Sequence, residues 1–226
     1  MAVKKRIFGY AAILTLVLFI LIYSFNVMLD QKREESLLDR VDDLFSDYEE
    51  LQAILLLSDV AQDEKMTCLA LESSLVYLNR IWETGRKIDT YQSLNEEFLN
   101  DPAYAKMKQK FNRGEIMYFS MLKKLKDECN VDKTVIQYFY KRPEECGNCD
   151  AQSFVLTDIN KELNEELTIF AFDADIGGPA VGLLTTYYNM TEYPCMVIEE
   201  DMYCGLHNKD QLIGILCRYG NLSVCS

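Results

Sequence analysis

The sequence is poor in histidine, tryptophan, proline and glycine. Its 226 residues include one histidine, one tryptophan, 4 prolines and 10 glycines. The lone His207 comes just before an expected helix start, where we interpret it as a surface residue, and nothing resembles the side-chain set of a serine or cysteine hydrolase. Neither glycine nor proline occurs between Gly9 and Gly85. The amino-terminal part of the chain is therefore free to form long helices.

Basic side chains are also in the minority. The chain has 23 lysines and arginines against 36 acidic residues, which gives a net charge of -13. This charge repels the phosphates of nucleic acids, so we expect no nucleic-acid partner. Hydrophobic residues make up 49% of the chain, and no low-complexity stretch interrupts it. We therefore predict a folded protein with room for an anchor and two compact units.

One long segment, residues 7–29, contains no charged side chain. As a helix it would extend about 34 Å, which is enough to cross a hydrocarbon core of about 30 Å. A cleaved signal peptide is the alternative, but its apolar part would be about 7 to 15 residues long and followed by a small-x-small cleavage site. We predict a retained single-pass anchor in a membrane.

Charges on either side of this segment predict its orientation. Residues 4–6 are all basic, whereas residues 30–35 mix both signs. By the positive-inside rule the amino terminus is cytoplasmic and the bulk of the chain is extracytoplasmic. We divide the chain into a cytoplasmic stub with the transmembrane anchor, an α-helical extracytoplasmic region and an α/β domain, over residues 1–29, 30–130 and 131–226.

The helical region begins with a heptad pattern. Its apolar residues follow one another by alternate steps of four and three: Leu37, Val41, Leu44, Tyr48, Leu51 and Leu55. We interpret this seam as packing within the chain, with a dimeric coiled coil near the membrane as the alternative.

Further amphipathic runs follow over residues 66–82, 88–99 and 116–125. We expect Asp59 or Asp63 to cap the first of these helices and Gly85 to end it. Asp101-Pro102 is expected to open a short later helix.

A Cys-x-x-Cys sequence, Cys146-Gly147-Asn148-Cys149, separates a β-rich run over residues 134–140 from a helical run that begins at Asp150. Two cysteines at the start of a helix can close a small disulfide. The partial positive charge of that helix end favours the thiolate of Cys146. The arrangement suits reversible electron exchange.

The rest of the α/β domain alternates in the same way. A strand over residues 167–172 precedes a helix that has Pro179 in its first turn and ends near Asn189. Two strands, joined by a tight turn at Glu199-Glu200, come next, and Asn208 is a good cap for a last helix. The order of the elements is βαβαββα.

Over roughly residues 131–218 the chain resembles the thioredoxin family. The resemblance depends on the strand before Cys146-Gly147-Asn148-Cys149, the Tyr193-Pro194 step that opens the terminal hairpin and the Gly205 that ends it. It implies a thioredoxin-like domain in which Cys146 is the nucleophile and Cys149 resolves the mixed disulfide. It also implies that Pro194 is a cis-proline that, with Tyr193, borders the substrate cleft.

The sequence departs from the family around the two cysteines. Glu145, preceded by Glu144, replaces the usual aromatic residue before the first cysteine. The helix end stabilises the Cys146 thiolate, and both carboxylates destabilise it. Each carboxylate contributes about 1 kcal/mol to the free energy of the thiolate in a surface dielectric. We align Gln137 with the buried acidic residue of the preceding strand, and without that carboxylate a proton for Cys149 has to come from water or another group.

Eight cysteines are an even number, and disulfides persist outside the cytoplasm. Cys195 and Cys204 fall opposite one another if the hairpin turns at residues 199–200. The remaining cysteines can tie the last helix to the tail and link two helices of the preceding region: Cys217 with Cys225, and Cys68 with Cys129. Spacing alone does not fix this connectivity.

A zinc site of four thiolates is the alternative use of Cys146, Cys149, Cys195 and Cys204. The eight residues between the last two, and the oxidising compartment, argue against it, so we expect no metal and no tightly held cofactor. Asn189 and Asn221 open Asn-x-Ser/Thr sequons, which permit glycosylation outside the cell.

These patterns predict a membrane-anchored, extracytoplasmic thiol-disulfide oxidoreductase that acts on protein thiols or disulfides through Cys146 and Cys149. The helical region would hold the site above the bilayer or bind a redox partner protein. The alternative is a non-catalytic interaction module of thioredoxin fold, with a structural disulfide, in a membrane or surface assembly.

Overall fold

The computed structural model describes residues 10, 13–29, 32, 53–54, 56–57, 60, 63–94 and 101–225. Residues 13–29 are helical and carry exposed side chains. Within the described ranges, no helix is long and apolar enough to span a bilayer. The heptad seam from Leu37 to Leu55 lies outside the described residues, so both interpretations of it stay predictions.

Between residues 63 and 130, the described part of the chain has the helices α2 Glu64–Leu78, α3 Ile81–Leu94 and α4 Pro102–Cys129. The elements after them are β1 Thr134–Tyr140, α5 Cys149–Leu163, the short 3-10 helix η2 Asn164–Glu166, β2 Leu167–Asp173, α6 Gly178–Tyr187, β3 Cys195–Ile198, β4 Asp201–Cys204 and α7 Lys209–Leu216. Apart from η2, this is the predicted βαβαββα order.

The four strands form one sheet in the order β2-β1-β3-β4. β1 runs parallel to β2, with Thr134 opposite Leu167, and antiparallel to β3, with Phe139 opposite Cys195. The β3-β4 hairpin turns at Glu199 and Glu200, as predicted. This strand order, with helices on both faces, confirms the thioredoxin-like fold.

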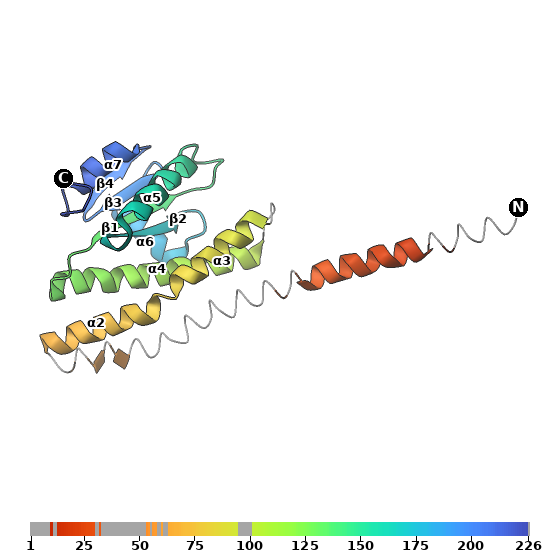
Figure 1. The fold of residues 1–226 in the computed structure, drawn as a ribbon, viewed down its shortest axis with the longest axis horizontal. Coiled ribbons are helices and arrows are strands. Elements are labelled where there is room, and N and C mark those ends of the chain that lie inside the picture. The colour runs from red at the N-terminus through yellow and green to blue at the C-terminus, as the bar shows by residue number, and fades with distance from the viewer. Residues whose placement is uncertain are drawn as a thin grey trace, which may run out of the picture.

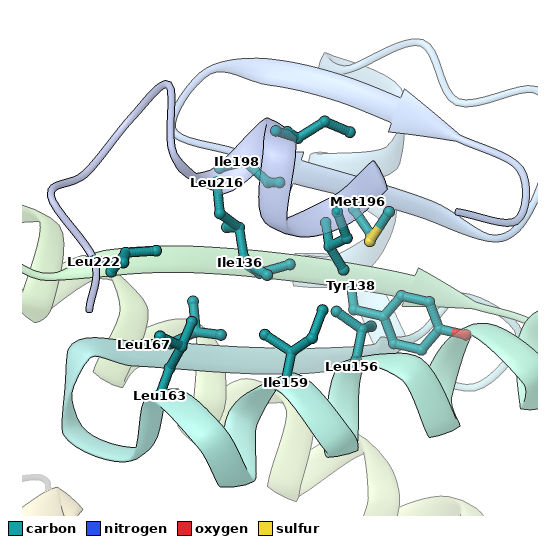
Figure 2. Packing of buried hydrophobic residues seen from close by; sticks show 12 residues of the cluster. Ile136, Tyr138, Leu156, Ile159, Leu163, Leu167, Met196, Ile198, Leu216 and Leu222 are labelled. Carbon is teal, nitrogen blue, oxygen red and sulfur yellow. The ribbon is translucent and has the colours of Figure 1, made fainter. Parts of the chain in front are cut away.

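Helices lie on both faces of the sheet (Figure 1). Alternation along the strands builds a separate core on each face. On one face, α5 and α7 cover Ile136, Tyr138, Met196 and Ile198, and Figure 2 shows leucine and isoleucine side chains of these helices pointing at the strands. On the other face, α4 and α6 cover residues that alternate with these, namely Val135, Phe139, Phe170, Phe172 and Val197.

Local sequence accounts for how the domain's helices begin. Asn208 caps α7 in a reciprocal arrangement, because its side chain accepts a hydrogen bond from the Gln211 backbone while the Gln211 side chain accepts one from the Asn208 backbone. Pro179 lies in the first turn of α6, where its missing N–H costs no helical bond. Both features agree with the sequence prediction.

Two predictions about the helical region are wrong. Gly85 does not end a helix but lies inside α3, where a Cβ atom would come within 2.8 Å of the Phe111 ring on α4. The glycine is therefore a point of close helix approach. The helix that opens at Pro102 is not short but runs unbroken to Cys129, because its apolar residues pack on both α2 and the sheet.

Candidate active site at Cys146 and Cys149

The chain leaves β1 at Tyr140 and reaches the Cys-x-x-Cys sequence through a turn. The backbone N–H of Cys146 donates to the Arg142 carbonyl at 2.9 Å, and the N–H of Cys149 donates to the Cys146 carbonyl at 3.3 Å. α5 begins at Cys149, with Asn148 as its cap residue. Cys146 therefore precedes the helix by one turn, and the two cysteines are joined in a disulfide with Cα atoms 5.5 Å apart.

Both half-cystines are largely covered. Cys146 is 4% exposed and Cys149 is 3% exposed, whereas Gly147 and Asn148 between them lie at the surface. Around the position where Gly147 would carry a Cβ there is no other heavy atom within 4 Å.

Lys141 connects the disulfide with the proline segment. Its backbone N–H donates to Cys149 Sγ at 3.5 Å, and its Nζ lies 5.3 Å from the centre of the Tyr193 ring. The same Nζ pairs with the carboxylates of Glu145 and of Asp175, the latter at 3.4 Å. The hydrogen bond to Glu145 raises the pKa of Lys141, against the opposing effect of desolvation. Glu145 thus meets a cation, which offsets the repulsion that its carboxylate would exert on a Cys146 thiolate.

The peptide bond between Tyr193 and Pro194 is cis. The Pro194 carbonyl accepts a hydrogen bond from the Gly205 N–H at 2.8 Å, which joins the two ends of the β3-β4 hairpin. Lys141 therefore links Cys149 with Tyr193, whereas the joint role of Cys146, Cys149, Tyr193 and Pro194 stays a prediction.

Gln137, which we aligned from the sequence with the buried acidic residue of the thioredoxin family, lies on the face of the sheet opposite to α5. Gln137 pairs across the sheet with Phe170 and Val197, so it points to the face covered by α4 and α6. Tyr138 points to the α5 face instead, and its hydroxyl donates to the Cys149 carbonyl at 2.6 Å. Sequence reasoning did not single out Tyr138, because the sequence alone does not show which side chains of this strand face α5.

Burial raises the pKa of the Tyr138 hydroxyl, so it stays protonated at neutral pH. It can hold the first turn of α5 in place as a hydrogen-bond donor but cannot remove a proton from Cys149. Cys149 also lines a cavity of about 930 Å³. Water in that cavity is a proton source that needs no carboxylate on the strand.

The other six cysteines form the pairs set out from their spacing, Cys195 with Cys204, Cys217 with Cys225 and Cys68 with Cys129. Cys195 and Cys204 face each other in the hairpin register. With all four sulfurs of the alternative zinc site paired in disulfides, none is a thiolate ligand. Among the described residues, no group of three metal-binding side chains comes together.

His207 is not a plain surface residue. It is half-buried, and its backbone N–H donates to Gln152 Oε1 at 2.7 Å, which holds the segment after Gly205 against the first turns of α5. Asn189 and Asn221 are exposed, as glycosylation would require, and their modification stays a prediction.

No family model matches the chain, and no curated protein matches it. The chain is similar to a solved malarial protein at 14% identity, over 38% of this chain and 97% of that chain, with a TM-score of 0.34. It is similar to chloroplastic thioredoxin z at 17% identity, over 43% of this chain and 87% of that chain, with a TM-score of 0.36. It is also similar to the germline-specific thioredoxin Deadhead of Drosophila melanogaster at 17% identity, over 44% of this chain and 92% of that chain, with a TM-score of 0.34. At these TM-scores the likeness alone assigns neither fold nor activity. The thioredoxin-like assignment therefore depends on the strand order and the placement of the helices.

Proposed function

We propose that this protein is a thiol-disulfide oxidoreductase that acts on protein substrates through Cys146 and Cys149. The observation that carries the proposal is the position of this disulfide, at the start of α5 and joined through Lys141 to the Tyr193-Pro194 segment. A helix start favours a thiolate at its first cysteine. The exposed residues Gly147 and Asn148 and the half-buried Tyr193 would offer a docking surface for an extended substrate, whereas Pro194 itself is buried.

The reaction is a pair of thiol-disulfide exchanges. A substrate thiolate attacks Cys146 Sγ, the Cys146–Cys149 bond breaks, and Cys149 leaves as a thiolate that takes up a proton. A second substrate thiolate then attacks the substrate sulfur of the mixed disulfide and releases Cys146. The substrate gains a disulfide and the protein becomes a dithiol. Run in reverse, the same steps reduce a substrate disulfide.

The proposal includes an extracytoplasmic site on a membrane-anchored chain. The uncharged segment 7–29, with basic residues before it, supports a single-pass anchor whose amino terminus is cytoplasmic. Four disulfides fit an oxidising compartment. The helices α2 to α4 would then hold the site near the bilayer or bind a protein that exchanges electrons with it.

Trapping of a mixed disulfide tests this function. Cys149→Ala leaves the Cys146 thiolate without its resolving partner, so the mixed disulfides that it forms by attack on substrate disulfides should accumulate as covalent adducts that dithiothreitol releases. Adducts are detected on non-reducing gels of the full-length protein expressed in cells, and mass spectrometry names the partners. The double variant Cys146→Ala/Cys149→Ala should form none.

Cys225→Ala is the matched control, because it also creates one unpaired cysteine, Cys217, but away from the proposed site. The proposal expects at least tenfold more adduct with Cys149→Ala than with Cys225→Ala. Equal amounts from both variants would mean that any free thiol in this protein forms such adducts, and the proposal would fail.

A second candidate is a non-catalytic interaction module with a structural Cys146–Cys149 bond. The low exposure of both half-cystines favours it. The two functions differ in exchange chemistry, because a structural disulfide resists the glutathione pool whereas a catalytic one equilibrates with it.

A further inference from the structure

A cavity of about 930 Å³ lies beside β2, the edge strand of the sheet. One face of α4 contributes a stripe of residues at helical spacing, in which aromatic rings alternate with charges: Tyr104, Lys108, Phe111, Glu115 and Tyr118. α3 and the outer side of β2 contribute further walls, with Trp82 and Ala171 among their residues. Figure 1 shows α3 running alongside α4.

Glu115 is a buried acidic residue in the lining of this cavity, and one of its carboxyl oxygens lacks a hydrogen-bond partner. It is 2% exposed, and its Oε1 accepts the Ala171 N–H of the edge strand at 3.2 Å. Its other oxygen, Oε2, is buried without any hydrogen-bond partner. A buried carboxyl oxygen that makes no hydrogen bond costs about 1–3 kcal/mol or more, so a native structure normally supplies a donor.

The surroundings of Glu115 favour a cationic donor with an apolar body. Trp82 packs edge-on against Tyr118, with ring centres 5.6 Å apart, and both line the cavity with Phe111. Aromatic faces attract ammonium groups, and a carboxylate beside them adds a charge-assisted hydrogen bond.

The buried cation Lys108 already has partners of its own. Its Nζ lies 5.2 Å from the centre of the Phe111 ring and 5.6 Å from that of Tyr140. Glu115 follows Lys108 by seven residues, which is about 10 Å along the axis of α4. Lys108 interacts electrostatically with Glu115, but it makes no hydrogen bond with Oε2, which is buried without a partner.

We infer that this cavity binds a small organic ammonium compound, whose N–H groups donate to Glu115 Oε2 while its apolar body lies against Trp82, Phe111 and Tyr118. Cys149 lines the same cavity, but binding at Glu115 does not depend on the exchange reaction at the two cysteines.

The protonation of Glu115 agrees with this inference. Desolvation raises the pKa of its carboxyl to about 8, against the opposing effects of Lys108 and the Ala171 N–H. Asp89 on α3 adds to the rise, and the charged Arg86 on α3 and Asp173 on β2 also line the cavity. An ammonium ligand would stabilise the carboxylate, so its binding should release a proton at neutral pH.

The probe for the experiment is benzylammonium, compared with the neutral benzyl alcohol and the anionic benzoate at pH 8. Trp82 is the only tryptophan of the chain and lines the cavity, so its fluorescence reports binding directly in the full-length protein in detergent. Benzylammonium should give a saturable change at concentrations at least tenfold below those needed for the other two probes.

Glu115→Gln keeps the acceptor for the Ala171 N–H but removes the charge, and should weaken benzylammonium binding about tenfold or more. Glu128→Gln, which changes an exposed acid on the same helix, should leave binding unchanged. Lys108→Met removes a nearby positive charge and should tighten binding severalfold.

Three results would overturn the inference: benzyl alcohol binding as well as benzylammonium, Glu115→Gln binding as well as the unchanged protein, or benzoate binding best and losing its affinity in Lys108→Met. If Glu115→Gln fails to fold, the comparison of the three probes on the unchanged protein still decides.

Discussion

Glu115 connects α4 with the edge of the sheet, and its titration affects stability. Its pKa is about 8 in the folded protein against an ordinary value of 4.5. The folded state therefore holds the proton more tightly than the unfolded state does. The contribution of the Glu115 carboxyl to the free energy of unfolding is greatest below pH 4.5. This contribution is lost as the pH rises to about 8.

Glu115→Gln should remove this pH dependence, because the amide keeps the hydrogen bond from Ala171 and cannot ionise. At pH 9 we expect the variant to be more stable than the unchanged protein by about 2 kcal/mol or more, since each unit of pKa shift corresponds to about 1.4 kcal/mol. At pH 4 the two should differ little. Urea unfolding followed by circular dichroism at both pH values measures this, and an equal difference at both would contradict it.

The position of some single residues could be predicted from the sequence, and that of others could not. Cys195 and Cys204 could be paired because a two-residue turn fixes which hairpin residues face each other. Gln137 and Tyr138 are neighbours on opposite faces, and every residue of β1 up to Phe139 is buried. Without an alternation of polar and apolar residues, the face of each side chain depends on packing that is not visible locally.

Among the elements, α3 and α4 approach each other closely where Gly85 meets Phe111. A Cβ at residue 85 would lie 2.8 Å from Phe111 Cζ, so the ring or the helices must shift to admit it. Overpacking of this kind costs about 1–3 kcal/mol. Gly182 in α6 is the opposite case, because it is exposed and a Cβ there would meet nothing within 4 Å.

Gly85→Ala should therefore lower the free energy of unfolding by about 1–3 kcal/mol, although alanine favours helix. Gly182→Ala should raise it by about 0.5–1 kcal/mol, because it gains helix propensity without a clash. Denaturant midpoints of the two variants give the comparison. A stabilising Gly85→Ala would mean that α3 and α4 do not approach at this point.

Gly85 illustrates why the elements of the α/β domain could be predicted better than the helices before them. In the α/β domain, turn residues and caps such as Asn208 lie at element ends, where local chemistry acts. In the helical region, Gly85 and Gly114 lie inside helices and serve contacts between helices. A glycine that permits close packing looks the same in the sequence as one that ends a helix.

At the scale of the whole molecule, the disulfides close loops of very different length. Cys68–Cys129 ties α2 to the end of α4, with a sequence separation of 61, whereas Cys217–Cys225 closes a separation of only 8. Longer loops lose more entropy in the unfolded chain when closed. The chain-entropy estimate is about 4 kcal/mol for the first and about 2.5 kcal/mol for the second.

Replacing both cysteines of each pair by alanine should therefore destabilise the protein more for Cys68 and Cys129 than for Cys217 and Cys225. The extra loss should be about 1–2 kcal/mol, measured by urea unfolding under non-reducing conditions. Equal losses would show that loop closure does not set the contribution of these bonds.

The most direct test of the proposed function is the reduction potential of the Cys146–Cys149 couple. The full-length protein is equilibrated in buffers of graded glutathione or dithiothreitol ratio, alkylated, and analysed peptide by peptide so that the other three disulfides serve as internal references. A catalytic couple should titrate between about -270 and -120 mV, while the references stay oxidised. A value below about -300 mV, together with no transfer of electrons to a protein disulfide, would contradict an oxidoreductase and leave the bond a structural one.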